Sequence, residues 1–291
     1  MKFSVIIPTY NRARLIKETI SSLLDQSFKD FEVIVVDDGS TDDTRAVVQE
    51  LKDPRVVYLY KKNGERGAAR NYGAQNAKGE YLNFFDSDDT AYDDHLSVAN
   101  EFITVNNLPK WFHVGYRIVD GNDHVVLEET NFKYDVAKRL IDTNFLGCNS
   151  VFIRKDLFLN NLFNEDRRLA SSEDWEIWLR IISRYDILSC DAITFQINNH
   201  EGRSLFTIPP EKIETRDLLM VELLLKDELF VRKFKKDLPM FIADRYTFFA
   251  LVFSLSKRQR VRVLMYLVKA FFRTPLVLGK RRFWAALKYF I

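Results

Sequence analysis

Three carboxylates stand within four positions in the stretch NFFDSDD, residues 83–89. Asp86, Asp88 and Asp89 directly follow an apolar run, and neighbouring carboxylates repel one another when charged. A bound cation, a Lys or Arg neighbour, or plain water could compensate this charge. Hard cations such as Mg²⁺ and Mn²⁺ take oxygen ligands and commonly share them with substrate phosphates. The alternative is a cap for the next helix, with Asp89 or Asp93 at its N-terminus.

Three further groups of polar residues have spacings that suit chemistry. PTYNR (8–12) and DDGSTDD (37–43) each follow an apolar run, and SSEDWEIWLR opens a predicted helix with Glu173 and Asp174. A carboxylate within hydrogen-bond reach of a hydroxyl can act as a general base. Acidic residues in the first turn of a helix also complement its dipole, which is the structural alternative for Glu173 and Asp174.

Glycine-rich phosphate loops do not account for this sequence. There is no G-x-x-x-x-G-K-[ST] motif, and Gly64, Gly67 and Gly73 do not form G-x-G-x-x-G after a strand. A ligand at these positions would therefore be bound by carboxylates and arginines.

The elements that must position these residues alternate in the first part of the chain. Strands are expected at residues 2–8, 31–38, 55–62 and 80–86, and helices at 13–27, 41–53 and 66–79. Such alternation predicts an α/β fold with a mostly parallel sheet covered by helices. Ligands of open α/β sheets bind outside the carboxyl ends of the strands. The three polar stretches that follow predicted strands, PTYNR, DDGSTDD and DSDD, are therefore expected at one site.

The second part of the chain is less regular. Strands are expected at 111–120, 124–132, 185–190 and 192–198, a strand followed by a helix at 147–158, and a helix at 171–185 with Ser172 as N-cap. From Pro209 onward the pattern is helical. We therefore predict a catalytic domain over 1–208, with a nucleotide-binding part in about 1–90 and an acceptor part in about 91–208. Residues 209–291 form a helical accessory region.

Composition indicates a folded protein of a reducing compartment. The 291 residues are 47% hydrophobic and 29% charged, and the two cysteines, Cys148 and Cys190, have no metal-site spacing. We expect free thiols. The N-terminal apolar run is too short for a signal peptide, so a cytoplasmic location is expected.

Charge is distributed unevenly along the chain. Residues 245–291 contain eleven Lys or Arg and no Asp or Glu, whereas the first 244 residues contain 32 basic and 41 acidic side chains. Helices rich in Phe, Leu, Trp and basic residues suit an anionic membrane surface, which would make the protein peripheral on the inner face of the cytoplasmic membrane. The alternative is that these helices pack on the catalytic domain and pair with its acids. No apolar run reaches the ~20 residues of a membrane span. Nucleic acid is not expected as a partner, because the body of the chain is acidic.

Four ordered motifs resemble those of a known family. VIIPTYN, VVDDGSTDDT, GAARNYGAQNAKGEYLNFFDSDD and SEDWEIWLR are similar to the family 2 glycosyltransferases of the GT-A fold, over about residues 3–200. The resemblance implies inverting transfer of a sugar from a nucleotide-diphosphate sugar, favouring UDP, with Mn²⁺ or Mg²⁺ as cofactor. It also implies a glycan or lipid-linked saccharide as acceptor, in bacterial surface-polysaccharide biosynthesis. It does not name the sugar.

The resemblance assigns roles in the nucleotide pocket. Pro8, Thr9 and Tyr10 would line it. Asp38 would accept a hydrogen bond from the uracil imide, a task that suits a carboxylate because it only accepts, and Asp37 would support the loop.

The acidic turn and two arginines would complete the donor site. The resemblance places Asp86 and Ser87 at the nucleotide, with Asp86 at the ribose, while Asp88 holds the metal and Asp89 orders the turn. Arg66 and Arg70 would meet base, ribose or phosphate through planar charge-assisted contacts. Alternatively, Arg70 pairs with an aspartate of the turn.

The resemblance also assigns the reaction's base and a closing loop. Asp174 matches the general base, supported by Glu173. His200 would contact metal or phosphate, and Arg203 and Ser204 the diphosphate. Cys148 and Asn149 would border the acceptor or donor sugar.

Two other functions remain open at this point. FFDSDDT satisfies the D-x-D-x-[TV] pattern of haloacid-dehalogenase-type phosphatases, although three strands precede it and no later strand ends in the required acidic pair. The second alternative is a nucleotide-sugar-binding module without activity.

Overall fold

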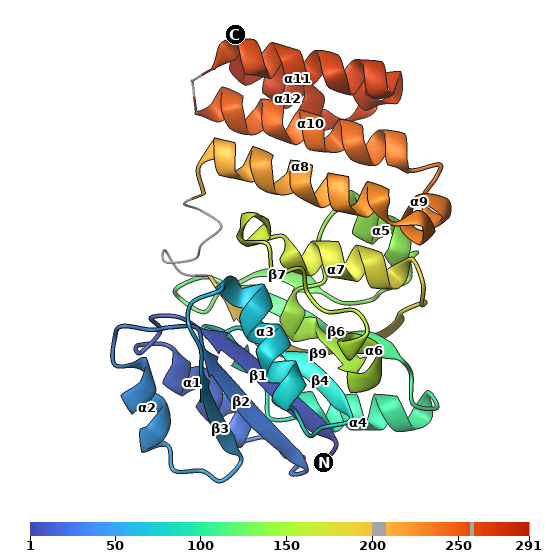
Figure 1. Cartoon of the computed structure of the whole chain (residues 1–291). Helices are drawn as coiled ribbons and strands as arrows, with labels where there is room; N and C mark the ends of the chain where they lie inside the picture. Colours follow the sequence, from blue (N-terminus) through green and yellow to red (C-terminus); the bar gives the residue numbers. More distant parts are fainter. Residues whose placement is uncertain (200–207, 257–258, 291) are drawn as a thin grey trace.

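The computed structural model describes residues 1–199, 208–256 and 259–290. A sheet flanked by helices forms one end of the molecule, and layers of helices extend from it toward the C-terminus (Figure 1). The strands are β1 Phe3–Thr9, β2 Phe31–Asp37, β3 Val56–Tyr60, β4 Tyr81–Phe84, β5 Thr90–Ala91, β6 Trp111–Val119, β7 Val125–Glu129, β8 Val151–Arg154 and β9 Leu188–Asn198.

Twelve α-helices are assigned within these described ranges. They are α1 Ile16–Leu24, α2 Thr44–Glu50, α3 Glu65–Asn76, α4 His95–Val105, α5 Val136–Asp142, α6 Lys155–Leu159, α7 Glu173–Ile182, α8 Pro210–Lys226, α9 Glu228–Lys233, α10 Leu238–Leu255, α11 Arg260–Arg273 and α12 Arg281–Phe290. Short 3₁₀ turns occur at η1 Cys148–Ser150, η2 Arg167–Leu169 and η4 Pro275–Gly279.

The sheet is mixed, with a parallel half that carries the predicted strand ends. Its order is β3-β2-β1-β4-β8-β6-β9-β5, with β7 paired to β6. β3, β2, β1 and β4 run parallel, β8 is antiparallel to both β4 and β6, and β6 and β9 are again parallel. All residues of β1 and β2 are buried, as expected for parallel strands covered on both faces. The strand–helix alternation predicted for the first ninety residues is confirmed.

One long strand replaces the two short ones expected at 185–190 and 192–198. β9 runs from Leu188 to Asn198 beside β6, and the register shifts at Gly115. A Cβ at Gly115 would lie 2.9 Å from the Glu129 oxygen and 3.0 Å from the Ala192 oxygen. Only glycine allows β6, β7 and β9 to approach so closely. The irregularity interrupts the apolar pattern of β9, which is why the sequence suggested a break.

Helix capping excludes the alternative given for the acidic turn and confirms Ser172 as the N-cap position of α7. α4 begins at His95 with Asp94 as N-cap, so neither Asp89 nor Asp93 caps it. Ser172 is the N-cap residue of α7, but in the described structure its side chain makes no capping hydrogen bond. The Glu173 Oε2 instead accepts from the backbone N–H of Ser171 at 2.7 Å. Asp89 does not cap α4, and the Glu173 carboxylate accepts from the backbone just before α7.

Hydrophobic side chains cover both faces of the sheet. Phe3, Val5 and Ile7 of β1 pack toward α1 and α4, whereas Ile6 packs toward α3. The cluster on the α3 side of the sheet, which contains Ile6, continues through Trp178 of α7 into the C-terminal helices. There it includes Met220, Leu224, Phe230 and Phe241. The packing is thus continuous across residue 208, and the division into a catalytic domain and an accessory region remains a prediction.

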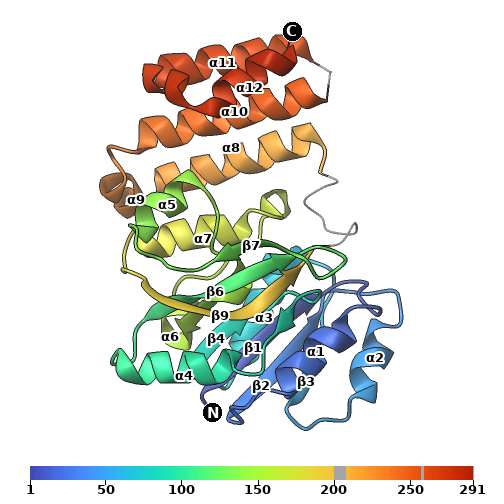
Figure 2. The same ribbon diagram turned by 180° about the vertical axis from the view of Figure 1, so that it is seen from behind.

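The C-terminal helices form a further layer. α11 and α12 both pack on α10. The shared cluster contains Phe249 and Phe253 of α10, Tyr266 and Leu267 of α11, and Phe283 and Ala286 of α12. Figure 2 shows α8, α10 and α11 following one another away from the sheet. α10 is long and apolar enough to cross a membrane, judged by length and composition alone. However, 56% of this 18-residue helix is buried inside the protein. Its packing is that of a core helix.

Three basic residues of the C-terminal segment pair with carboxylates of the helical region. Arg245 Nη1 lies 3.5 Å from Asp217 and its Nη2 lies 3.1 Å from Asp244. Arg282 Nη1 lies 2.6 Å from Asp244, and Arg262 Nη1 lies 3.3 Å from Glu214. These carboxylates lie within residues 209–291, so the three pairs neutralise part of the basic charge inside the helical region and not through acids of the catalytic domain.

Candidate active site

A cavity of about 540 Å³ opens at the carboxyl ends of β1, β2 and β4. Its walls include the following residues proposed from the sequence: Pro8, Thr9, Tyr10, Asp38, Arg66, Arg70, Asp86, Ser87, Asp88, Asp89, Cys148, Asn149, Glu173 and Asp174. The parallel strands end at one edge, which brings these distant segments together. His200, Arg203 and Ser204 lie outside the described residues.

Two aspartates at the end of β2 have different surroundings. Asp37 is buried beneath the cavity wall, where it accepts from the backbone N–H of Ser40 at 2.7 Å and from the Tyr58 hydroxyl at 2.5 Å. Asp38 faces the cavity, and its Oδ1 accepts from Lys61 Nζ at 2.8 Å and from the Gly64 N–H at 2.9 Å. These bonds fix the loop and orient the Asp38 carboxylate.

The aspartates of the NFFDSDD turn are compensated in three different ways. Asp89 is buried and accepts from Asn149 Nδ2 at 2.7 Å and from the Asn198 N–H at 3.0 Å. Asp86 Oδ1 accepts from Arg70 Nη2 at 2.9 Å. Asp88 Oδ2 lies 3.6 Å from Arg12 Nη2. The turn therefore combines a structural acid with two acids at the cavity wall.

The same turn fits a divalent cation. One ligand oxygen from each of Asp86, Asp88 and Asp89 lies within 4.8 Å of the others. Because amide donors already engage both oxygens of the buried Asp89, the carboxylates of Asp86 and Asp88 are better suited as ligands. An all-oxygen set of this kind matches the preference of Mg²⁺ and Mn²⁺.

Arg70 links the acidic turn to the start of α7. Its guanidinium is 2% exposed, and Nη1 donates to Glu173 Oε1 at 2.8 Å while Nη2 donates to Asp86. Arg66 Nε lies 3.9 Å from the same Glu173 oxygen. The pairing of Arg70 with the turn corresponds to the second of the two alternatives considered from the sequence.

Replacing Arg70 by methionine is expected to lower the free energy of unfolding by about 3–5 kcal/mol, because the buried Glu173 carboxylate would lose its hydrogen-bonded countercharge and keep only the more distant Arg66. Urea unfolding measures this. Arg117→Met is a matched control, since Arg117 pairs with Glu128 at 2.6 Å on the surface and such pairs contribute little. Equal stability losses in the two variants would contradict the assigned importance of the Arg70 bridge.

Asp174 lies in the first turn of α7 at the cavity wall. Burial, and next the charge of Glu173, raise its pKa to about 6, while Arg70 and hydrogen bonds from the Trp175 N–H and Asn144 oppose the shift. A carboxylate that titrates near neutral pH takes up a proton more readily than an ordinary aspartate.

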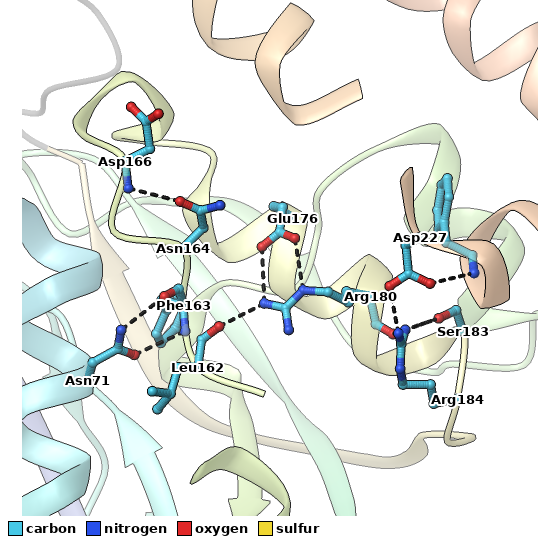
Figure 3. A network of polar contacts seen from close by, with 11 residues as sticks. Asn71, Leu162, Phe163, Asn164, Asp166, Glu176, Arg180, Ser183, Arg184 and Asp227 are labelled. Atoms are coloured by element: carbon cyan, nitrogen blue, oxygen red, sulfur yellow. Dashed lines mark hydrogen bonds and ion pairs between the residues drawn. The ribbon is translucent and has the colours of Figure 1, made fainter. Parts of the chain in front are cut away.

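A polar network holds α7 against α3 through the loop before it (Figure 3). Arg180 Nε donates to Glu176 Oε1 at 2.9 Å and its Nη2 to the Leu162 carbonyl at 2.8 Å. Asn71 of α3 exchanges two bonds with the backbone of Phe163, at 2.9 and 3.0 Å. The loop is thereby tied to both helices, which positions Glu173 and Asp174 relative to α3.

The other end of α7 is held by the C-terminal helices. Arg184 Nη2 donates to Asp227 Oδ2 at 2.7 Å, and Asp227 caps α9 by accepting from the Phe230 N–H (Figure 3). Near the first turn, the Arg245 guanidinium lies 4.5 Å from the Trp175 ring centre. The helical region thus contributes directly to the placement of α7.

Several cavity and supporting residues were not singled out from the sequence. They are Arg12, Lys61, Asn63, Asn144 and Asn198. The rule that ligand sites lie at strand ends could have identified Arg12 after β1, and Lys61 and Asn63 after β3. The same rule applies to Asn198, the last residue of β9. Asn144 follows α5, and no local signal marks it.

Known proteins resemble this chain in sequence and in fold. Residues 4–158 match the sequence model of the family described as Glycosyl transferase family 2. An "Uncharacterized glycosyltransferase" of Rickettsia felis is 36% identical over 211 residues, which cover 72% of this chain and 35% of that relative. The chain thus spans about a third of that relative's length. The GalNAc(5)-diNAcBac-PP-undecaprenol beta-1,3-glucosyltransferase of Campylobacter jejuni is 34% identical over 185 residues, 57% of this chain and 55% of the relative.

A solved structure extends the likeness to the helical region. S. aureus TarS 1-349 in complex with UDP-GlcNAc is 25% identical with a TM-score of 0.75, over 99% of this chain and 88% of that one. The fold is therefore GT-A with a C-terminal helical region, and the phosphatase alternative has no support. The chain belongs to glycosyl transferase family 2.

Proposed function

We propose that this protein is an inverting glycosyltransferase that moves a sugar from a UDP-sugar to a hydroxyl of a saccharide or lipid-linked acceptor. The observation that carries the proposal is one cavity holding both the acidic turn and Asp174, an acid with a raised pKa. The similarity to a protein that binds UDP-GlcNAc supports the donor class. The undecaprenol-linked substrate in the name of the Campylobacter relative supports the acceptor class.

The nucleotide would occupy the part of the cavity at the carboxyl ends of β1 and β2. Asp38 accepts from the base imide, with its other contacts to Lys61 and Gly64 holding the carboxylate in place. Asp37 supports this loop. Further nucleotide contacts come from Pro8, Thr9, Tyr10, Arg66, Asp86 and Ser87, while Arg70 supports the site from within through Asp86 and Glu173.

Mg²⁺ or Mn²⁺ would be held by Asp88, with Asp86 and the donor diphosphate as neighbouring ligands. When bound, such an ion supplies positive charge that stabilises a leaving diphosphate. Asp89 keeps the turn in position through Asn149 and Asn198.

Asp174 acts as the general base. As the acceptor oxygen forms its bond to the anomeric carbon, its proton passes to the Asp174 carboxylate. The bond from that carbon to the diphosphate oxygen breaks on the opposite face, and UDP leaves with the electron pair. Configuration inverts in one displacement. Glu173 and Arg70 position the base, since Glu173 accepts from Arg70 at 2.8 Å.

We place this reaction at the cytoplasmic face of the membrane, in bacterial surface-polysaccharide or glycan assembly. A lipid-linked acceptor would be presented there.

Screening nucleotide sugars with Mn²⁺ tests the proposed function. A UDP-sugar at about 100 times its Kd should stabilise the protein by about 2.7 kcal/mol, which raises the melting temperature by several degrees, and UDP should be released on turnover. Binding without release of UDP across a broad acceptor panel would show a non-catalytic module. Phosphate release from simple phosphomonoesters, with no UDP-sugar stabilisation, would contradict the proposal.

A further inference from the structure

The outermost helix, α11, is apolar on two opposite faces. Val263, Tyr266, Leu267 and Ala270 are buried in the contact with α10. The opposite face exposes a second apolar set, which we call the outer stripe: Val261, Leu264, Met265, Val268 and Phe272. Four of these residues follow one another at intervals of four, three and four, so they align along one side of a helix.

The outer stripe is too exposed to be explained by the core of this chain. Val261 is 81% exposed and Phe272 is 80% exposed. A helix that covers one core needs one apolar face, and contiguous exposed apolar surface marks a site of interaction. The apolar surface continues in η4, where Leu276 is 76% exposed. The following α12 exposes Trp284, whose indole N–H donates to the Leu278 carbonyl at 2.7 Å.

Basic residues accompany this surface. Residues 259–290 contain Lys and Arg but no Asp or Glu. Arg262 and Lys269 are seven residues apart and flank the stripe on one side, and Arg273 is exposed at the end of α11. Arg262 also pairs with Glu214 at 3.3 Å. Lys and Arg beside apolar and Trp side chains are the composition of helices that lie at a lipid interface.

We propose that the outer stripe of α11, with its flanking basic residues, rests on an anionic lipid surface. The helix axis would lie parallel to that surface, which differs from a spanning role for α10. The distribution of charge supports this orientation. α11 is at the end of the molecule opposite the sheet (Figure 1), and residues 1–244 carry 41 acidic against 32 basic side chains. A negative surface attracts the α11 end and repels the acidic remainder.

A second copy of this chain fits the surface less well. In a two-fold dimer through the outer stripe, the same patch faces itself. The basic residues that border it would then be brought together without acids from that segment to neutralise them, which is unfavourable. An anionic bilayer satisfies both the apolar and the basic side chains.

Vesicle co-sedimentation of the full chain tests this inference. The probes are phosphatidylcholine vesicles with and without phosphatidylglycerol. We expect binding to require phosphatidylglycerol and to weaken with salt. The double variant Val261→Gln/Phe272→Gln should reduce partitioning by about tenfold or more, because two exposed apolar side chains no longer enter the interface. The matched control is Val105→Gln/Val126→Gln, at residues 74% and 62% exposed elsewhere on the molecule.

Three results would overturn the inference. They are equal sedimentation of the wild type and the outer-stripe variant, equal binding to both kinds of vesicle, and a lipid-free dimer that the variant converts to monomer. Arg273→Gln should weaken binding to anionic vesicles but not change the melting temperature. Stabilisation by UDP-sugar should be the same in all variants, so failure of this inference is distinguishable from failure of the proposed function.

Discussion

Asp174→Asn is expected to lower the rate of sugar transfer by about 10²–10⁴-fold while UDP binding is retained, because an amide cannot accept the proton of the acceptor hydroxyl. Asparagine has nearly the same shape, and its side-chain oxygen can still accept from the Trp175 N–H, as Asp174 does at 2.7 Å. Transfer to acceptor and binding of UDP are measured separately. Asp186→Asn is the control, since Asp186 follows the same helix but its side chain is 96% exposed.

The pH profile gives an independent readout of the same residue. The pKa of Asp174 is raised to about 6 by burial and by Glu173, with Arg70 opposing. The charged form is required, so kcat/KM should fall about tenfold per pH unit below about 6 and level off above it. The acidic limb should be absent in the Asn variant. Full transfer activity in that variant, or an unchanged acidic limb, would show that another group takes the proton.

Asp88→Asn is expected to weaken Mn²⁺ or Mg²⁺ binding in the presence of UDP by at least about tenfold and to reduce transfer by about 10²-fold or more. The carboxylate supplies both the oxygen ligand and the negative charge that a hard cation prefers. Asp88 lies at the cavity wall 3.6 Å from Arg12, so the change should leave the fold intact. Calorimetric titration of the metal with and without UDP measures the effect.

The exposed residue Asp93, five positions further along the chain, provides the matched control as Asp93→Asn. It changes the same charge outside the cavity and should leave metal affinity and transfer unchanged. Metal titration curves that coincide for wild type and Asp88→Asn would refute the role given to Asp88. A large loss of thermal stability in Asp88→Asn would instead mark this acid as structural, as its neighbour Asp89 is.

Much of the cavity wall at the strand ends could be predicted from the sequence. The runs at 2–8 and 31–38 are continuous apolar segments because β1 and β2 are buried on both faces. Their polar ends had to meet, since parallel strands terminate at one edge. Local periodicity similarly placed α7 and its acidic first turn. These features depend on neighbouring residues only.

The sequence by itself therefore determined the family, the parallel half of the sheet and the group of residues at its edge. Tertiary structure alone decided which charges meet. Arg70 joins Asp86, 16 residues away, to Glu173, 103 residues away, and Asn149 and Asn198 hold Asp89. The pKa of Asp174 and the second apolar face of α11 likewise depend on what the chain folds against them. Local spacing sets secondary structure, but burial and ion pairing are set by contacts between distant segments, which no local pattern contains.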